Sequence, residues 1–412
     1  MVIGPGGTGV SVTAASAALG RSGARRTGGT RDAARSGSPV TANDRDTLLI
    51  TIDRHAPTAA LLGVYRQPDE PVMVSSRLHL LSLDRLELLE RTWSEFTSVL
   101  SETLSRSKVT LPGLGAVADI AAGEIATLPG VEDFLVLRRI RDEAISGQWR
   151  RIVVDVSGLG DPFEFLRASS VLSQTLNRLW PRHRRLAAAS ERPMLAQLTG
   201  AVDAIDRDCV DITELVTDPH VVAVHVVVGV DDRGERLLPH FLATADVMGL
   251  ALRSVVVNRG VGADRAHSGC EERVARLRSV VQADGADVEC TEIHLLDDAI
   301  DRAARLRKLG VGLPAPNGRS YGSGAAQLTE TADSGVGTSR AYELTWRQRL
   351  PDPDGLQLGR SGDDLLVTVG GFRHPVRLPS VLRRCVVVDA AWDGVHLTIG
   401  FVPDPGLWPQ SR

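Results

Sequence analysis

The sequence MVIGPGGTGVSVTAASAALG, residues 1–20, places a glycine cluster between a short apolar stretch and an Ala/Val/Ser-rich run. Val2 and Ile3 predict the end of a β-strand, and residues 11–19 predict a helix. A glycine-rich turn from a strand into a helix is typical of a phosphate-binding loop. Backbone N–H groups and the helix dipole both attract anions there. The segment therefore predicts a nucleotide-binding α/β domain.

The loop lacks the lysine that such loops normally carry. In a phosphate-binding loop a lysine reaches the β- and γ-phosphates, and the Ser or Thr that follows it holds Mg²⁺. Val10 occupies the lysine position here, and Ser11 occupies the magnesium position. The whole chain has two lysines, Lys108 and Lys308. The pattern predicts a loop that still surrounds phosphates but has lost its positive charge.

Two other interpretations of the loop stay open. The spacing Gly4-x-Gly6-x-x-Gly9 also matches the dinucleotide-binding fingerprint. Asp53 ends the next apolar run, where that fingerprint places a ribose-binding acid. The third interpretation is a flexible glycine-rich terminus. The strand-like and helix-like flanks count against it.

The bulk properties limit the class of protein. A length of 412 residues suggests two or three domains, and a net charge of −4 argues against a general nucleic-acid-binding surface. The four cysteines form no CxxC pair, which argues against a disulfide framework and a zinc site. We find no membrane-length apolar run and no signal segment. We expect a cytoplasmic protein with no membrane span and no nucleic-acid partner.

Apolar runs that alternate with helical patterns predict a doubly wound, mostly parallel sheet. The runs are residues 47–53, 78–84, 150–155, 220–229 and 252–260. Asp53, Asp155 and Asn258 each lie at the end of such a run. Ligands of these sheets bind at the carboxyl ends of the strands, so the three side chains are candidate site residues.

Changes in composition and hydrophobic patterning along the sequence predict the domain organisation. Residues 1–312 form the α/β domain, with a mobile Gly/Arg/Ser-rich insertion at 20–46. Residues 313–340 are rich in Pro, Gly, Ser and Thr and predict a flexible linker. Residues 341–412 alternate with period two, with hairpin turns at Gly370-Gly371 and Asp393-Gly394, and predict a small all-β sandwich.

Several motifs, in order and spacing, resemble one family. They are the loop at 4–11, TIDRHAPTAALLG (51–63), LPGVEDFLVLRRI (128–140), IVVDVSGLGDPFEFLR (152–167) and VVVNRG (255–260). Together they resemble the arsenical-pump ATPase and tail-anchored-protein-targeting ATPase family, a P-loop group with a deviant Walker A loop. The β module from Tyr342, above all LGRSGDDLLVTVGGFRHPVRLP, resembles the small-heat-shock-like domain fused to many actinobacterial members.

The resemblance implies ATP and Mg²⁺ as ligands. Asp53, in the first switch segment, would orient the attacking water, Asp155 would hold Mg²⁺ through water, and Asn258 would hydrogen-bond the base. Ser11 would ligate Mg²⁺ directly. The remaining nucleotide-binding positions are those of the loop: Gly4, Gly6, Gly7, Thr8, Gly9 and Val10.

The departures from the family pattern predict weak or absent hydrolysis. Pro5 replaces the signature lysine that reaches the partner subunit's nucleotide, and Val10 replaces the loop lysine. Loss of charge stabilisation at a transferring phosphoryl group can lower the rate by several orders of magnitude. We therefore favour a nucleotide-binding protein that is a weak or inactive ATPase. An active Mg-dependent ATPase that uses arginines such as Arg54, or a dinucleotide-binding oxidoreductase, are the alternatives.

Partners follow from the same resemblance. It implies a homodimer, or a heterodimer with an active paralogue, and an unidentified client protein, with the β module supplying protein contacts. The scattered cysteines make metalloid binding a poor expectation. The first strand has only Val2 and Ile3 before the loop, which suggests that the natural chain begins several residues upstream. The basic cluster Arg182–Arg185 is more typical of a solvated helix end than of a phosphate contact.

Overall fold

The computed structural model describes residues 1–20, 45–106, 119–124, 127–128, 130–191, 196–260, 269–283, 287–296, 299–332 and 340–407. Internal contacts divide the chain into two units. The first unit contains residues 1–6, 10–216 and 296–312, and the second contains residues 7–9, 217–295 and 313–412. Most of the insertion expected at 20–46 lies outside the described residues, and Arg45 already belongs to a strand.

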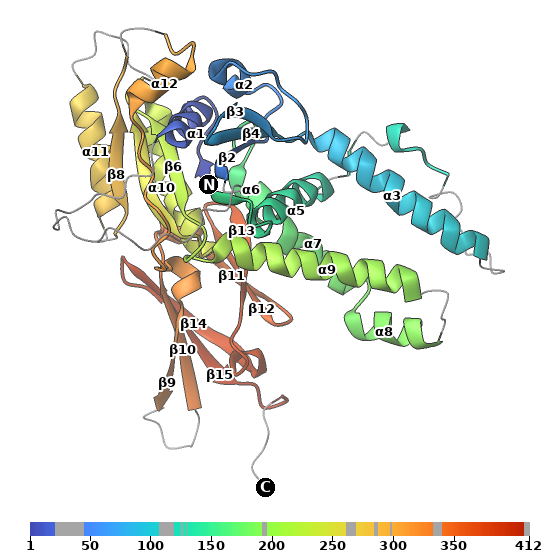
Figure 1. Ribbon diagram of the computed structural model, residues 1–412. Helices are drawn as coiled ribbons and strands as arrows, with labels where there is room; N and C mark the ends of the chain where they lie inside the picture. The colour runs from blue at the N-terminus through green and yellow to red at the C-terminus, as the bar shows by residue number, and fades with distance from the viewer. Residues whose placement is uncertain are drawn as a thin grey trace, which may run out of the picture. The chain divides into compact units, whose positions relative to one another are not determined.

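The large sheet has eight strands in the order β3-β4-β2-β5-β1-β6-β7-β8 (Figure 1). The pairs β2–β4, β2–β5, β1–β5, β6–β7 and β7–β8 are parallel, and β3–β4 is antiparallel. The predicted fold class, a mostly parallel α/β sheet followed by an all-β domain, is confirmed. The strands of this sheet are β1 (Val2–Ile3), β2 (Arg45–Thr51), β3 (Val72–Ser75), β4 (Leu78–Ser82), β5 (Trp149–Asp155), β6 (Val224–Gly229), β7 (Leu252–Asn258) and β8 (Glu289–Ile293).

The central strands are apolar along their whole length because a parallel sheet is covered on both faces. Every residue of β4, β6 and β7 is buried, including the alternate positions that an exposed sheet face would leave polar. Two polar residues in this core satisfy each other, since His225 Nδ1 on β6 lies 2.8 Å from Ser254 Oγ on β7. The apolar runs of the sequence thus correspond to buried strands. The carboxyl ends of β2, β5 and β7 lie at or within two residues of Asp53, Asp155 and Asn258.

The helices of the first unit follow the strands, and several begin at recognisable sequence signals. Asp161 caps α6 by accepting a hydrogen bond from Phe163 N, with Pro162 at the first helical position. The helices are α1 (Val10–Leu19), α2 (Thr58–Leu62), α3 (Arg85–Arg106), η1 (Ala122–Glu124), α5 (Val131–Ile145), α6 (Pro162–Leu166), α7 (Ala168–Leu179), α8 (Arg182–Glu191), α9 (Ala196–Thr217) and α12 (Ala303–Leu309).

The second unit contributes two long helices beside β6, β7 and β8. Asp231 caps α10 (Asp232–Val247) by accepting a hydrogen bond from Gly234 N, and α11 (Cys270–Gln282) packs against α10 and β7. α10 thus lies between β6 and β7, in keeping with the predicted alternation of apolar runs and helical patterns.

The carboxyl-terminal region forms two antiparallel sheets, β14-β15-β10-β9 and β11-β12-β13. The turn at Gly370-Gly371 has φ values of +57° and +82° and joins paired Val369 and Phe372, as a two-residue hairpin requires. In the edge strand β14 the pairing register shifts between Val387 and Asp389. The elements are η3 (Gly322–Ala325), β9 (Gln327–Ala332), β10 (Arg340–Arg347), η4 (Pro353–Gly355), β11 (Gln357–Ser361), β12 (Asp364–Val369), β13 (Phe372–Arg377), η5 (Leu382–Arg384), β14 (Cys385–Trp392) and β15 (His396–Pro403).

The segment expected as a flexible linker carries defined structure. Residues 313–326, which we term the strap, contact the elements around α10 within the second unit. Ser323 Oγ donates to Val247 O at 2.7 Å, and a Cβ at Gly322 (φ +57°) would lie 1.9 Å from Asp246 O. β9 follows the strap and pairs with β10. Only a residue without a side chain fits at position 322.

The β domain also contacts α10 directly. Gln348 is buried and its Nε2 donates to Ala243 O at 2.9 Å. Arg349 Nη1 lies 2.9 Å from Asp246 Oδ1, and Arg349 N donates to Asp246 Oδ2 at 3.1 Å. These contacts fix the end of α10 to the start of the loop that follows β10.

Candidate functional site

Two serine hydroxyls and two carboxylates gather at the ends of β2 and β5 in the first unit. Ser11, the second residue of α1, has its Oγ 2.9 Å from Ser157 Oγ. Asp155 ends β5 and is 0% exposed, and Thr51 Oγ1 donates to its Oδ2 at 3.4 Å. Its other oxygen, Oδ1, accepts no hydrogen bond of ordinary geometry from the described residues. A buried carboxylate oxygen without a donor is a ready ligand for a cation or for its water.

The surroundings of Asp155 set its protonation. Burial raises its pKa to about 6, and the negative charge of Asp53 adds to this, while the hydroxyls of Ser11, Ser157 and Thr51 lower it. At neutral pH the group is mostly the carboxylate. A bound cation would offset the unfavourable free energy of burying its negative charge. Hard oxygen ligands of this kind suit Mg²⁺, so the side chains of Ser11 and Asp155 fit the ion that the family resemblance implies.

Asp53 lies just beyond β2 and is half-buried. Its Oδ1 accepts a hydrogen bond from His55 N at 2.8 Å, the local turn that a purely structural strand-end aspartate makes. Its carboxyl group also lies against Gly158, which has a φ of +73°. A Cβ there would lie 2.3 Å from Asp53 Cγ. The segments after β2 and β5 therefore pack together at this point with no room for a side chain.

The middle of the glycine loop is fixed within the second unit. Thr8 Oγ1 donates to Val227 O on β6 at 3.1 Å. Asn258, the last residue of β7, donates from Nδ2 to Thr8 O at 2.9 Å, and its Oδ1 accepts from Gly260 N at 2.9 Å. Gly9, with a φ of +89°, passes so close that a Cβ would lie 2.5 Å from Asn258 Nδ2.

The two positions that lack lysine hold buried apolar side chains. Val10 is 5% exposed, and Pro5 is also buried, whereas Gly6 and Gly7 between them are exposed. Lys308 lies in the last turn of α12, and Lys108 lies outside the described residues. The loop thus presents exposed glycine backbone without an ammonium group of its own.

The structure brings the predicted residues together in two groups. Ser11, Asp53 and Asp155 surround the ends of β2 and β5, and Thr8, Gly9 and Asn258 surround the ends of β6 and β7. Sequence reasoning missed the contributions of Ser157 and Gly158. Their position directly after a strand-end aspartate was the available signal.

Comparison with known proteins decides the family. The family model described as anion-transporting ATPase matches residues 2–307. The chain belongs to the anion-transporting ATPase family. A second model, described as an HSP20-like domain found in ArsA, matches residues 340–401, which span β10 to most of β15.

Individual relatives cover almost the whole chain. Protein Rv2184c of Mycobacterium tuberculosis is 31% identical over 389 residues, covering 88% of this chain and 90% of the relative. The uncharacterized protein SCO2128 of Streptomyces coelicolor is 30% identical over 443 aligned residues, covering 100% and 99%. A putative arsenical pump-driving ATPase of Chlorobaculum tepidum is 20% identical over 352 residues, covering 81% and 83%. The three alignments therefore extend over at least four-fifths of this chain and of each relative.

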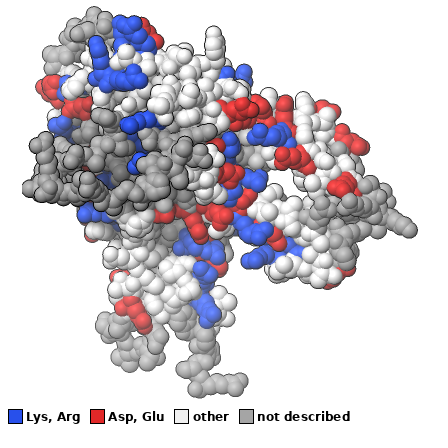
Figure 2. All heavy atoms as spheres, viewed as in Figure 1, with Lys and Arg blue, Asp and Glu red and all other residues white. Residues whose placement is uncertain are grey.

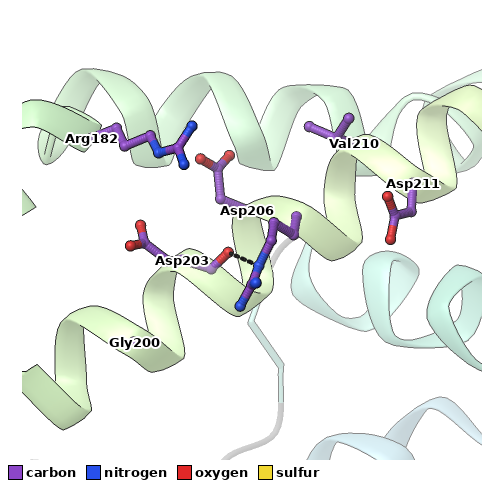
Figure 3. A pocket seen from close by; sticks show the side chains of 7 residues that line it. Arg182, Gly200, Asp203, Asp206, Val210 and Asp211 are labelled. Carbon is purple, nitrogen blue, oxygen red and sulfur yellow. Dashed lines mark hydrogen bonds between the residues drawn. The ribbon is translucent and has the colours of Figure 1, made fainter. Parts of the chain in front are cut away.

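A pocket of about 420 Å³ lies between α8 and α9 of the anion-transporting ATPase domain. Figure 3 shows Arg182, Asp203 and Asp206 among the side chains that line it. Arg185 is 0% exposed and pairs with Asp203 at 2.7 Å and Asp206 at 2.8 Å. The basic cluster thus includes a buried structural arginine, and the pocket's carboxylates already have a cationic partner.

Other surface features of this family member are ordinary. On the face that Figure 2 shows, basic and acidic side chains of the described residues are interspersed rather than gathered into one large patch. Within the described ranges, no three His, Cys, Asp or Glu side chains form a group that could hold a metal ion. No described helix combines the length and hydropathy needed to cross a bilayer.

Proposed function

We propose that this family member binds a magnesium–nucleoside triphosphate, ATP, through its glycine loop and hydrolyses it weakly or not at all. One contrast carries the proposal. Ser11 and buried Asp155 offer oxygen ligands that suit magnesium, while the two positions where the family pattern has lysine hold buried Pro5 and Val10. The family membership favours a triphosphate over the dinucleotide that the glycine spacing left open.

The chain's own groups divide the work in this proposal. Exposed Gly6 and Gly7 would face the phosphates with their backbone, and the start of α1 adds its dipole. Ser11 and Asp155 would hold the ion, which supplies charge neutralisation between the phosphates. Asp53 would orient the attacking water.

The absence of a loop lysine sets the expected rate. Without an ammonium at the β- and γ-phosphates, the charge that develops during phosphoryl transfer lacks a preorganised partner. A positive group that stabilises this charge in phosphoryl transfer is worth about three to five orders of magnitude in rate in the enzymes where its loss has been compared. Arg54 is exposed directly after Asp53 and is one arginine that an active enzyme could recruit for this charge.

Calorimetry with ATP, with and without Mg²⁺, tests the proposal, with phosphate release followed on the same samples. We expect magnesium-dependent binding with little or no release, and loss of the magnesium dependence in Asp155→Asn. Asp352→Asn, an exposed carboxylate of the β domain, is the matched control and should leave both unchanged. Absence of binding at millimolar ATP would overturn the proposal. Steady release that disappears in Asp53→Asn would instead identify an active Mg-dependent ATPase, coupled to ion transport or protein targeting.

We also propose that the protein works through partners, as a homodimer or with an active paralogue, and that the β domain supplies the contact to a client protein. The support is the exposed apolar edge of that domain, where Val386 and Val388 of β14 are 39% and 57% exposed. Sedimentation of the purified chain with and without Mg-ATP checks the dimer. A monomer at every concentration and in both conditions would leave only the heterodimer, which co-purification with the paralogue tests.

A further inference from the structure

Asn258 is the side chain that connects the glycine loop to the end of β7. It is 9% exposed, and its amide makes two hydrogen bonds within the protein, both 2.9 Å long: one to Thr8 O and one from Gly260 N. The family resemblance gives this residue the task of contacting a base. In the structure its amide is bonded to the backbone of the glycine loop.

Thr8 shows why that bond matters for the loop. Its side chain is anchored to β6 through Val227 O, and Thr8 is itself buried. A buried carbonyl needs a donor, and Asn258 supplies one to Thr8 O. The flanking Gly7 and Gly9 have φ values of +84° and +89°, and because glycine adopts both positive and negative φ readily, bonds to Thr8 are needed to hold the loop in this one conformation.

The spacing between the loop and Asn258 adds a steric argument. A Cβ at Gly9 would lie 2.5 Å from Asn258 Nδ2, so the loop backbone and the amide are in direct contact. A loop without lysine has no ammonium through which a bound phosphate could draw it into shape. Its shape must then come from bonds within the protein, and the described bonds to Thr8 are of that kind.

We propose that Asn258 is a positioning residue that holds the glycine loop in its phosphate-binding conformation, and that the site recognises the polyphosphate chain of its ligand rather than the base. This inference rests on the proposed nucleotide binding and deepens it. It predicts that ATP, GTP and inorganic tripolyphosphate, each with Mg²⁺, bind with affinities within about threefold of one another.

The Asn258 amide keeps a second hydrogen, so the residue has a hydrogen-bond donor for a base as well as for the loop. Tripolyphosphate has no base, and its binding therefore separates a loop-positioning role from a base-binding role. Calorimetric affinities for Mg-ATP and magnesium tripolyphosphate are compared between the wild-type protein and Asn258→Ala. Loss of a loop-positioning hydrogen bond weakens both ligands by the same factor, about threefold to tenfold. Loss of a base contact weakens ATP alone.

Two further variants keep the comparison decisive. Thr8→Val removes the bond to Val227 O but leaves the carbonyl that Asn258 holds, and it should also weaken both ligands equally. Asn317→Ala, an exposed asparagine of the second unit, should change neither. Thermal unfolding of each variant confirms that the fold is retained, and Thr8→Val carries the test if Asn258→Ala does not fold.

The outcomes separate this inference from the proposed function. Equal weakening of ATP and tripolyphosphate supports it. Weakening of ATP alone, or a wild-type preference for ATP over GTP of tenfold or more, overturns it while leaving nucleotide binding intact. No binding of any of the three ligands by the wild-type protein overturns the proposed function itself.

Discussion

At the scale of single residues, Gly158 links the segments that follow β2 and β5. It combines a φ of +73° with a position where a Cβ would lie 2.3 Å from Asp53 Cγ. Gly63, at the end of α2, has the same φ of +73° and nothing within 4 Å of its Cβ position. Alanine substitutions at Gly158 and Gly63 therefore separate two contributions to the loss of stability: the unfavourable backbone conformation and the displacement of Asp53.

Gly158→Ala should therefore destabilise the protein more than Gly63→Ala does. Both variants bear the left-handed backbone cost of roughly 1 kcal/mol, and Gly158→Ala must also move the Asp53 carboxyl group. Urea unfolding measures the difference, and calorimetry should show weaker Mg-ATP binding in Gly158→Ala alone. Equal losses of stability in the two variants would mean that Asp53 moves aside freely.

The buried carboxyl group of Asp155 predicts a pH dependence. Its pKa is raised from 3.8 to about 6 in the folded protein, so folding favours its protonated form. This contribution is fully present below about pH 4 and is lost as the pH rises through 6. Asp155→Asn removes it, so its stability relative to the wild-type protein should increase between pH 4 and pH 7, by up to about 3 kcal/mol.

Urea titrations of both proteins at several pH values, without divalent ions, measure this difference. Added Mg²⁺ should stabilise the wild-type protein above pH 6 and lose its effect at pH 4, because the ion competes with the proton for Asp155. A stability difference that does not change with pH would contradict the raised pKa.

The positions of Ser11, Asp53 and Asp155 near one another could be predicted, because each residue has a clear local signal, a loop end or a strand end. The bonds made by Ser157 and by Asn258 with Thr8 could not. They depend on which strand ends become neighbours, and residues 8 and 258 are 250 positions apart in the sequence. Arg185 was missed for a similar reason, since its burial requires the carboxylates of α9.

At the scale of elements, α10 supports much of the second unit. It bears the buried ion pair of Asp246 with Arg349 and accepts the Gln348 bond at Ala243 O. Sequence periodicity predicted α10 and the buried strands well, because long apolar patterns leave few alternatives. It did not predict β9, because the sequence QLTETA is mostly polar. This segment forms a strand by pairing with β10.

Arg349→Ala should be strongly destabilising. It leaves the Asp246 carboxylate, which has a side-chain exposure of 3%, without its guanidinium partner, and breaking such a buried pair costs about 3–5 kcal/mol. Arg377, 61% exposed and paired with Asp363 and Asp364, provides the matched control, and Arg377→Ala should cost less than about 1 kcal/mol. Urea unfolding followed by the fluorescence of buried Trp346 compares them. Similar losses of stability in the two variants would show that the buried ion pair of Asp246 stabilises the protein no more than an exposed ion pair does.

At the scale of the whole molecule, the β domain and the α10 region form part of one unit, joined by the strap and by Gln348. Domain matching alone presents the HSP20-like domain as an appended module. The contacts indicate instead that residues 217–295 rely on residues 313–412 for part of their packing.

A chain that ends at Gly312 should therefore lose protection in β7. Hydrogen exchange of the β7 amides should become faster than in the full chain, because α10 loses its contacts with Ser323, Gln348 and Arg349. The amides of β4 in the first unit provide the internal reference and should exchange at an unchanged rate. Unchanged protection of β7 would show that the β domain is only tethered.

The irregular pairing in β14 has a consequence for how the protein behaves at high concentration. β14 is an edge strand, and its outer backbone groups would otherwise offer a straight template for a strand of another molecule. The register shift between Val387 and Asp389 interrupts that template beside exposed Val386 and Val388. The irregular edge therefore opposes ordered aggregation of the protein, and a deletion that restored regular pairing should form fibrils that the wild-type protein does not.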